Sequence, residues 1–248
     1  MFETLGAIVI SVMVVSVVSL IGIVTLATRK SIDKILRIIV SFAAGSMAGA
    51  SFLVLLPEAI ETGSSQSIPF FVLLGIIAFF ILENFLHWYH CHKGHCKVHR
   101  VTYLNLIGDG LHNLIDGMAI AASYLISFPL GITATIAIIA HEIPQEIGDF
   151  GILLYGGFSK KKALFYNFLS ALTALIGAAF VYLFRFGIVN YNALLVAFAA
   201  GTFIYMSMAD LVPELHKEEN ISKSALQLIL FLFGVLLIWG VSAVFGSA

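Results

Sequence analysis

The chain carries one apolar stretch twice. Residues 41–59 read SFAAGSMAGASFLVLLPEA, and residues 197–215 read AFAAGTFIYMSMADLVPEL, with Phe-Ala-Ala-Gly, a later Ser and Leu, and the closing Pro-Glu at matched positions. Each copy is long enough to cross the ~30 Å hydrocarbon core of a bilayer as a helix. We expect the copies to be the second and seventh spans of the chain. They lie an odd number of crossings apart, so they run in opposite directions through the membrane. Inverted repeats of this kind are typical of transporters, although apolar helices rich in Ala and Gly also resemble one another by chance.

The composition indicates that the whole chain, and not only these two stretches, belongs to a membrane protein. The sequence is 60% hydrophobic and 11% charged, with a mean hydropathy of +1.03, whereas soluble domains carry about 25% charged residues. The net charge of −1 argues against nucleic-acid binding. We expect an all-α integral membrane protein with eight transmembrane helices in a single membrane domain, residues 1–248. The predicted spans are 4–28, 35–60, 68–89, 101–127, 129–156, 163–186, 191–215 and 223–245.

Charge predicts the orientation of these spans. If the N-terminus lies outside the cytoplasm, the inner loops hold every Lys and Arg except Arg185, as the positive-inside rule requires. Both termini are then extracytoplasmic, in a multi-pass protein of the plasma or inner membrane. The N-terminal MFETLGAIV carries Glu3 and no basic residue, so it is predicted to be a retained first span and not a cleaved signal peptide.

Two polar motifs interrupt the apolar fourth and fifth spans. Residues 109–117 read DGLHNLIDG and residues 141–149 read HEIPQEIGD, with no Lys or Arg in either. A charged side chain at bilayer depth costs about 2.5–3.5 kcal/mol, so these carboxylates need a cation. Their mixture with imidazoles favours zinc, iron, manganese or cadmium. The polar residues are Asp109, His112, Asn113, Asp116, His141, Glu142, Gln145, Glu146 and Asp149.

Helix geometry predicts which of these residues meet. With a rise of about 1.5 Å per residue, His112 and His141 lie ~16 Å and ~18 Å into their spans, near the bilayer midplane. The short connection SFPLG makes the two helices antiparallel, which predicts that His112 lies level with Gln145 and Asp116 with His141. Residues four apart share a helix face, so these four are expected to converge on one metal ion.

The remaining polar residues of the two motifs extend this site. Asn113, Glu142 and Glu146 lie one position further round their helices and form an adjacent stripe for a second metal ion or a proton. Asp109 and Asp149, expected level with one another nearer the cytoplasm, are predicted to line an exit path. A buried hydrogen-bond network that only joins helices is the alternative explanation of the same residues.

The motifs HNLIDG and HEIPQEIGDF resemble the fourth and fifth helices of the ZIP family of divalent-metal transporters, and most of all a bacterial member of the subfamily whose fifth helix reads HExPHExGD. The resemblance implies a 3+2+3 arrangement of helices, an inverted repeat of spans one to three and six to eight, a homodimer, and metal transport into the cytoplasm. It implies a primary site of His112, Asp116, His141 and Gln145, and a secondary site of Asn113, Glu142 and Glu146. Gln145 departs from the usual His, and its neutral amide oxygen is a harder and weaker ligand.

Other polar residues have a less specific pattern. Residues 87–100 form a loop rich in His and Cys, expected in the cytoplasm with reduced thiols, where it either binds metal loosely or is simply solvated. Glu58 is expected to attract cations at the outer entrance. Asp210 and Glu214 form either a further metal site or a helix cap, and Glu83 is expected to pair with a neighbouring helix. The candidate loop ligands are His90, Cys91, His92, His95 and Cys96.

The function most consistent with the sequence is a carrier whose substrate is zinc, or iron, manganese or cadmium, with metal ions and lipid as partners and no resident cofactor. An intramembrane zinc enzyme is the first alternative, but HEIPQ lacks the second His of the HExxH motif. A metal-gated channel or receptor is the second alternative.

Overall fold

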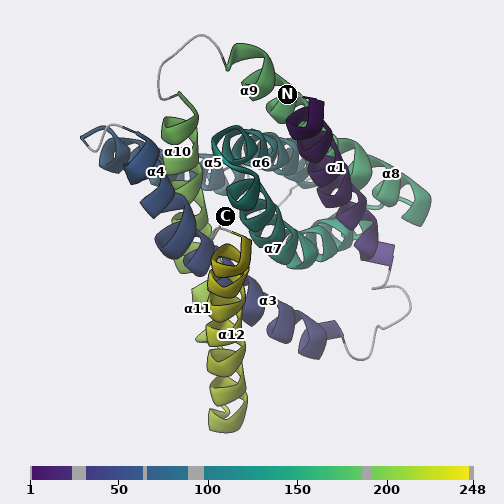
Figure 1. Cartoon of the computed structure of the whole chain (residues 1–248). Helices are drawn as coiled ribbons and strands as arrows, with labels where there is room; N and C mark the ends of the chain where they lie inside the picture. The colour runs from purple at the N-terminus through teal and green to yellow at the C-terminus, as the bar shows by residue number, and fades with distance from the viewer. Residues whose placement is uncertain (1, 24–31, 64–65, 89–97, 186–190, 246–248) are drawn as a thin grey trace.

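The computed structural model describes residues 2–23, 32–63, 66–88, 98–185 and 191–245, and their regular structure is entirely helical (Figure 1). Within these ranges the helices form eight rods, which confirms the predicted all-α membrane fold. In chain order the rods are α1 (Phe2–Val18) with η1 (Ser19–Ile23); α3 (Ile32–Ala50) with η2 (Ser51–Leu55) and α4 (Leu56–Thr62); α5 (Ile68–Trp88); α6 (Val98–Ile126); α7 (Phe128–Tyr155); α8 (Lys160–Ala171) with α9 (Thr173–Phe184); α10 (Tyr191–Tyr205) with η3 (Met206–Leu211) and α11 (Val212–Leu215); and α12 (Ile221–Phe245).

The distribution of apolar side chains is that of a membrane protein. Five helical segments of the described chain are long and apolar enough to cross a bilayer, and residues 68–84 of α5 form a shorter apolar helix. The outer surface exposes large apolar side chains such as Phe70, Leu183 and Leu236. Helices α6 and α7 are also long, with 29 and 28 residues, but they carry the ionisable motifs. They are therefore not among the five apolar segments. The carboxylates Asp109, Asp116, Glu142 and Glu146 of these motifs are instead buried among the other helices.

The inverted repeat is visible in the backbone. In both copies, a π-helical segment immediately precedes the Pro-Glu pair: η2 comes before Pro57, and η3 comes before Pro213. Proline has no N–H to donate and its ring clashes with the carbonyl four residues earlier, which favours a local widening of the helix. The same distortion at matched positions supports a true repeat over a chance similarity.

Helix packing follows the same symmetry. The second rod packs on the eighth through α3 and α12, and the seventh packs on the third through α10 and α5. Gly45 of α3 lies so close to the carbonyl of Phe231 that a Cβ atom would overlap it. Gly201, the matched residue of α10, lies equally close to the carbonyl of Val72. Equivalent glycines therefore hold equivalent helix pairs together.

Helices α6 and α7, the two central helices, occupy the middle of the molecule. Helices α1, α8 and α9 lie on one side of them, and α3, α4, α10 and α12 lie on the other (Figure 1). They contact each other, and each also contacts helices of both repeats, as the 3+2+3 arrangement predicts. A single extended residue, Ser127, separates α6 from α7, and its hydroxyl accepts a hydrogen bond from the Leu130 N–H at 3.3 Å. This N-cap and Pro129 in the first turn make the reversal very tight.

Candidate metal centre

A first cluster of four ionisable side chains joins α6 to α7. His112 and Asp116 come from α6, and His141 and Glu142 come from α7; all four are buried, with candidate ligand atoms within 4.8 Å of one another. The Nε2 atom of His112 lies 3.2 Å from Nε2 of His141 and 3.1 Å from Oε1 of Glu142. The Nε2 atom of His141 lies 3.1 Å from Oδ2 of Asp116. Two imidazoles and two carboxylates around one point form a ligand set suited to zinc.

The hydrogen bond behind His141 prepares this imidazole for a metal. Its Nδ1 atom lies 3.2 Å from the carbonyl oxygen of Ala137. A carbonyl only accepts hydrogen bonds, so Nδ1 carries the proton and donates. In the neutral ring the lone pair is then on Nε2, which faces the cluster. Such an outer hydrogen bond fixes the tautomer and orientation of metal-binding histidines.

Some carboxylate oxygens of this cluster have no hydrogen-bond partner. Oδ1 of Asp116 and Oε2 of Glu142 are buried without a hydrogen-bond partner. Leaving one such acceptor unpaired costs about 1–3 kcal/mol, and more for a charged group. Phe79 and Phe203 cover the two imidazoles, with ring centroids 5.4 Å from His112 and 5.5 Å from His141. A cation at this point would satisfy carboxylates that water does not reach.

A second cluster lies beside the first. It contains Asp109 of α6 with Glu146 and Asp149 of α7, again with ligand atoms within 4.8 Å of one another. Asn113 donates to Oδ1 of Asp109 at 2.8 Å, and Asn105 donates to Oδ1 of Asp149 at 2.8 Å. Three carboxylates at this separation repel one another unless a cation or protons are shared among them.

A third helix, α8, supports the second cluster. The sequence analysis did not predict this support. From α8, the Asn167 amide donates to the carboxylate of Glu146, and the Ser170 hydroxyl donates to the carboxylate of Asp109. Both residues are buried. The signal in the sequence was that Asn167 and Ser170 are polar residues three positions apart, on one face of a mainly apolar span. Several buried acceptors still lack partners here: Oδ1 of Asn113, Oε1 of Glu146, Oδ2 of Asp149 and Oδ1 of Asn167.

The predicted alignment of α6 with α7 brings Asp109 and Asp149 together as expected but differs at Gln145. Gln145 does not lie level with His112; its amide nitrogen is 3.5 Å from Oδ1 of Asp109. Glu142 takes the expected place beside His112. Two of the predicted pairs are kept, so the difference reflects how α7 is rotated about its axis and not a shift along it. The predicted contact between Asp116 and His141 is present.

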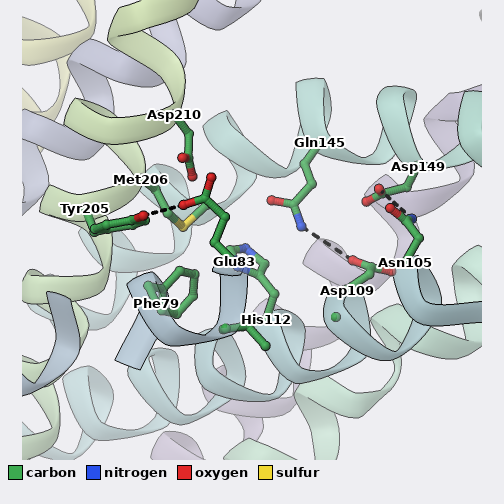
Figure 2. A pocket seen from close by; sticks show the side chains of 12 residues that line it. Phe79, Glu83, Asn105, Asp109, His112, Gln145, Asp149, Tyr205, Met206 and Asp210 are labelled. Atoms are coloured by element: carbon green, nitrogen blue, oxygen red, sulfur yellow. Dashed lines mark hydrogen bonds between the residues drawn. The ribbon is translucent and has the colours of Figure 1, made fainter. Parts of the chain in front are cut away.

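A cavity of about 170 Å³ extends from this centre to α5 and α10 (Figure 2). In this view Asp109 and Gln145 lie on one side and Asp210 on the other, with Glu83 and His112 between them. The Tyr205 hydroxyl of α10 donates to the carboxylate of Glu83 on α5, which confirms the predicted pairing of Glu83 with a neighbouring helix. The other residues that line the cavity are Phe79, Leu82, Asn105, Gly108, Asp149, Tyr205 and Met206.

The remaining predicted residues lie apart from the two clusters. Glu58 is half-buried in the first turn of α4, near the far end of the second rod. Glu214 is exposed and pairs with Lys217, whereas Asp210 lines the cavity, so the two side chains have different surroundings. The loop ligands His90, Cys91, His92, His95 and Cys96 lie outside the described residues.

Comparison with known proteins agrees with this geometry. The family model of the ZIP zinc transporters matches residues 4–102 and 90–242. The chain is 36% identical to the zinc transporter ZIP13 of Pongo abelii over 216 residues, which cover 81% of this chain and 65% of that protein. It is 32% identical to a zinc transporter ZIP13 homolog of Drosophila melanogaster, over 83% of this chain and 77% of that protein.

Another relative carries a broader name. The metal cation symporter ZIP8 of Rattus norvegicus is 41% identical over 124 residues, which cover 48% of this chain and 26% of that protein. The chain thus spans just under two thirds of the Pongo relative and about a quarter of the rat one. The family match nevertheless extends over most of the present sequence, and this chain belongs to the ZIP zinc transporter family.

Proposed function

We propose that this protein carries divalent metal ions across the membrane into the cytoplasm, with zinc as the main substrate and iron, manganese and cadmium as further ones. The observation that carries the proposal is the first cluster: two imidazoles and two carboxylates, all buried, with acceptor atoms that lack partners. A network that only joined helices would pair these atoms, because unpaired acceptors inside a membrane protein are costly. The family match supports transport over the alternative of a zinc enzyme.

The primary ligands in this proposal are His112, Asp116, His141 and Glu142. The sequence assigned Glu142 to the secondary site and Gln145 to the primary one. The distance of 3.1 Å between Glu142 and His112 supports the exchange. Gln145 then borders the cavity beside Asp109, where its amide oxygen is available to an ion that passes.

The second cluster provides the next position along the path. Asp109, Glu146 and Asp149, with Asn113 beside them, hold either a second metal ion or protons. The cavity continues from His112 past Asp109 to Asn105 and Asp149, and we infer that metal leaves along this wall, with Asp210 opposite. Glu58, near the other end of the second rod, attracts cations before they enter.

The membrane arrangement completes the proposal. The chain is a single domain, residues 1–248, that resembles bacterial members of the HExPHExGD subfamily. It lies in the plasma or inner membrane with both termini outside the cytoplasm and forms a homodimer. Most Lys and Arg residues then face the cytoplasm, and the His- and Cys-rich loop 87–100 meets metal ions as they leave the carrier.

Uptake by purified protein in proteoliposomes tests the proposal. Zinc, iron, manganese and cadmium are offered separately, with and without a pH gradient. A carrier accumulates metal at a rate that saturates with concentration. An enzyme moves none, and a channel conducts without such saturation. Absence of uptake for all four metals would refute the proposed function.

A further inference from the structure

A second hollow lies away from the metal centre, between the last two rods. It has a volume of about 700 Å³ and lies beside the 216–220 connection. Met208, Val212 and Leu215 form one wall, spaced as one face of the seventh rod. Leu228 and Phe231 of α12 stand opposite. The walls are mainly apolar, and the hollow is therefore a groove that an apolar chain can fill.

One polar side chain inside this groove has no partner. Gln227 of α12 is 6% exposed, and neither its amide nitrogen nor its amide oxygen has a hydrogen-bond partner. It contributes to the lining of the groove. A buried amide without a partner costs about 1–3 kcal/mol, and the bilayer core supplies no water to reduce this cost. An acceptor atom on a ligand in the groove would satisfy its N–H groups.

The rim of the groove carries excess negative charge. Of the acidic residues in the connection, Glu218 lies 3.6 Å from Lys223, and nearby Glu214 pairs with Lys217. Glu219, which also lines the groove, is exposed and has no ion pair in the described part of the chain. A cationic group is the complement of this rim. Helix α12 begins at Ile221, and Gln227 lies about 9 Å further along the helix axis. Gln227 is therefore deeper in the groove than the rim.

We propose that this groove binds a phospholipid with a primary-amine headgroup, phosphatidylethanolamine. The ammonium group pairs with Glu219 at the rim. An ester carbonyl, which lies between headgroup and chains, accepts a hydrogen bond from the amide of Gln227. One acyl chain then lies against Met208, Val212 and Phe231. The exposed carboxylate, the buried amide and the apolar walls thus offer one partner to each part of this lipid.

This lipid site is separate from the metal centre. Met206 and Asp210 line the metal cavity, whereas Met208 and Val212 line the groove. Positions two apart point to nearly opposite sides of a helix, so the seventh rod separates the two spaces. The lipid proposal therefore does not depend on metal transport, and either can fail alone.

Native mass spectrometry of the full chain tests the proposal. The protein is released from nanodiscs that contain equal amounts of phosphatidylethanolamine and phosphatidylcholine with the same acyl chains. We expect the wild-type protein to retain the ethanolamine lipid about fivefold more than the choline lipid, because only a primary ammonium can donate a hydrogen bond to the Glu219 carboxylate. Glu219→Gln should lower this ratio toward one. Gln227→Leu should lower the retention of both lipids without changing the ratio, because both lipids carry the same ester carbonyl. Glu61→Gln, an exposed carboxylate far along the sequence, is the matched control and should leave it unchanged.

The contrary results are equally specific. Equal retention of both lipids by the wild-type protein would overturn the proposal. So would a ratio unaffected by Glu219→Gln, which is an exposed substitution that leaves packing intact. A lipid-free dimer whose formation is abolished by substitutions in the groove would assign this surface to a second copy of the chain instead.

Discussion

Neighbouring residues of α7 serve different clusters. His141 and Glu142 belong to the first cluster, while Gln145 and Glu146, about one turn later, face the second. Two adjacent residues of α7 can belong to the same cluster because α6 lies between the directions in which their side chains point. The fourth ligand of the primary site is therefore decided by a rotation that a sequence motif does not specify.

This difference leads to a prediction for Glu142 and Gln145. Glu142→Gln removes a negative charge 3.1 Å from His112 and should weaken zinc binding by at least about tenfold, the lower range for disturbed metal sites. Gln145→Ala removes a neutral amide beside Asp109 and should change zinc affinity less than about threefold. Competition with a zinc chelator on purified protein measures both. Equal losses in the two variants would restore Gln145 to the primary site.

At the scale of helices, α8 acts as a support for the second cluster. Asn167 and Ser170 donate hydrogen bonds to Glu146 and Asp109, which positions these carboxylates although α8 belongs to an outer repeat. Two buried donors hold their acceptors in place more firmly than solvent would. The second cluster thus depends on three helices, whereas the first depends on α6 and α7.

Asn167→Leu should therefore affect the two clusters unequally. It leaves the Glu146 carboxylate without its donor, which costs about 1–3 kcal/mol of stability. It should reduce any second metal equivalent and slow uptake severalfold. The affinity of the first metal should change less than about twofold, because Asn167 makes no contact there. Metal titration by isothermal calorimetry separates the two, and loss of both sites together would show a general structural defect.

Close helix packing gives a second prediction at this scale. Gly45→Ala places a methyl group where the Phe231 carbonyl lies, whereas Gly240 of α12 has open space around it. Gly45→Ala should lower stability by about 1–3 kcal/mol through overpacking, and Gly240→Ala should not. Thermal unfolding in detergent measures the difference. Similar melting temperatures for the two variants would mean that the α3–α12 contact is looser than described.

The sequence predicted the helices far better than their register. Long apolar runs, the repeat and the two polar motifs were enough for eight helical rods and for the meeting of His112, Asp116 and His141. The pairing of Gln145 with His112 failed while that of Asp116 with His141 held, because helical spacing does not fix how a helix is rotated about its own axis. The contribution of Asn167 could not be predicted, because one Asn in an apolar span fits many environments.

At the scale of the whole molecule, the two repeats surround a central pair that carries the chemistry. The repeats contribute apolar covers to the site, with Phe79 from α5 and Phe203 from α10 against the two histidines. The central helices contribute nearly all of the buried charge. A bilayer tolerates such charge only inside a bundle. The repeats therefore shield the candidate metal centre from lipid, while the cavity extends from it to α5 and α10.

Zinc uptake into proteoliposomes by His112→Ala tests the central claim most directly. Ser123→Ala, a buried polar residue on the same helix and outside both clusters, serves as the control. The account predicts that His112→Ala lowers the initial uptake rate at least about a hundredfold, since it removes one of two imidazole ligands, while Ser123→Ala transports normally and both proteins remain folded. Uptake by His112→Ala at the wild-type rate would contradict the claim that metal crosses the membrane through the site between α6 and α7.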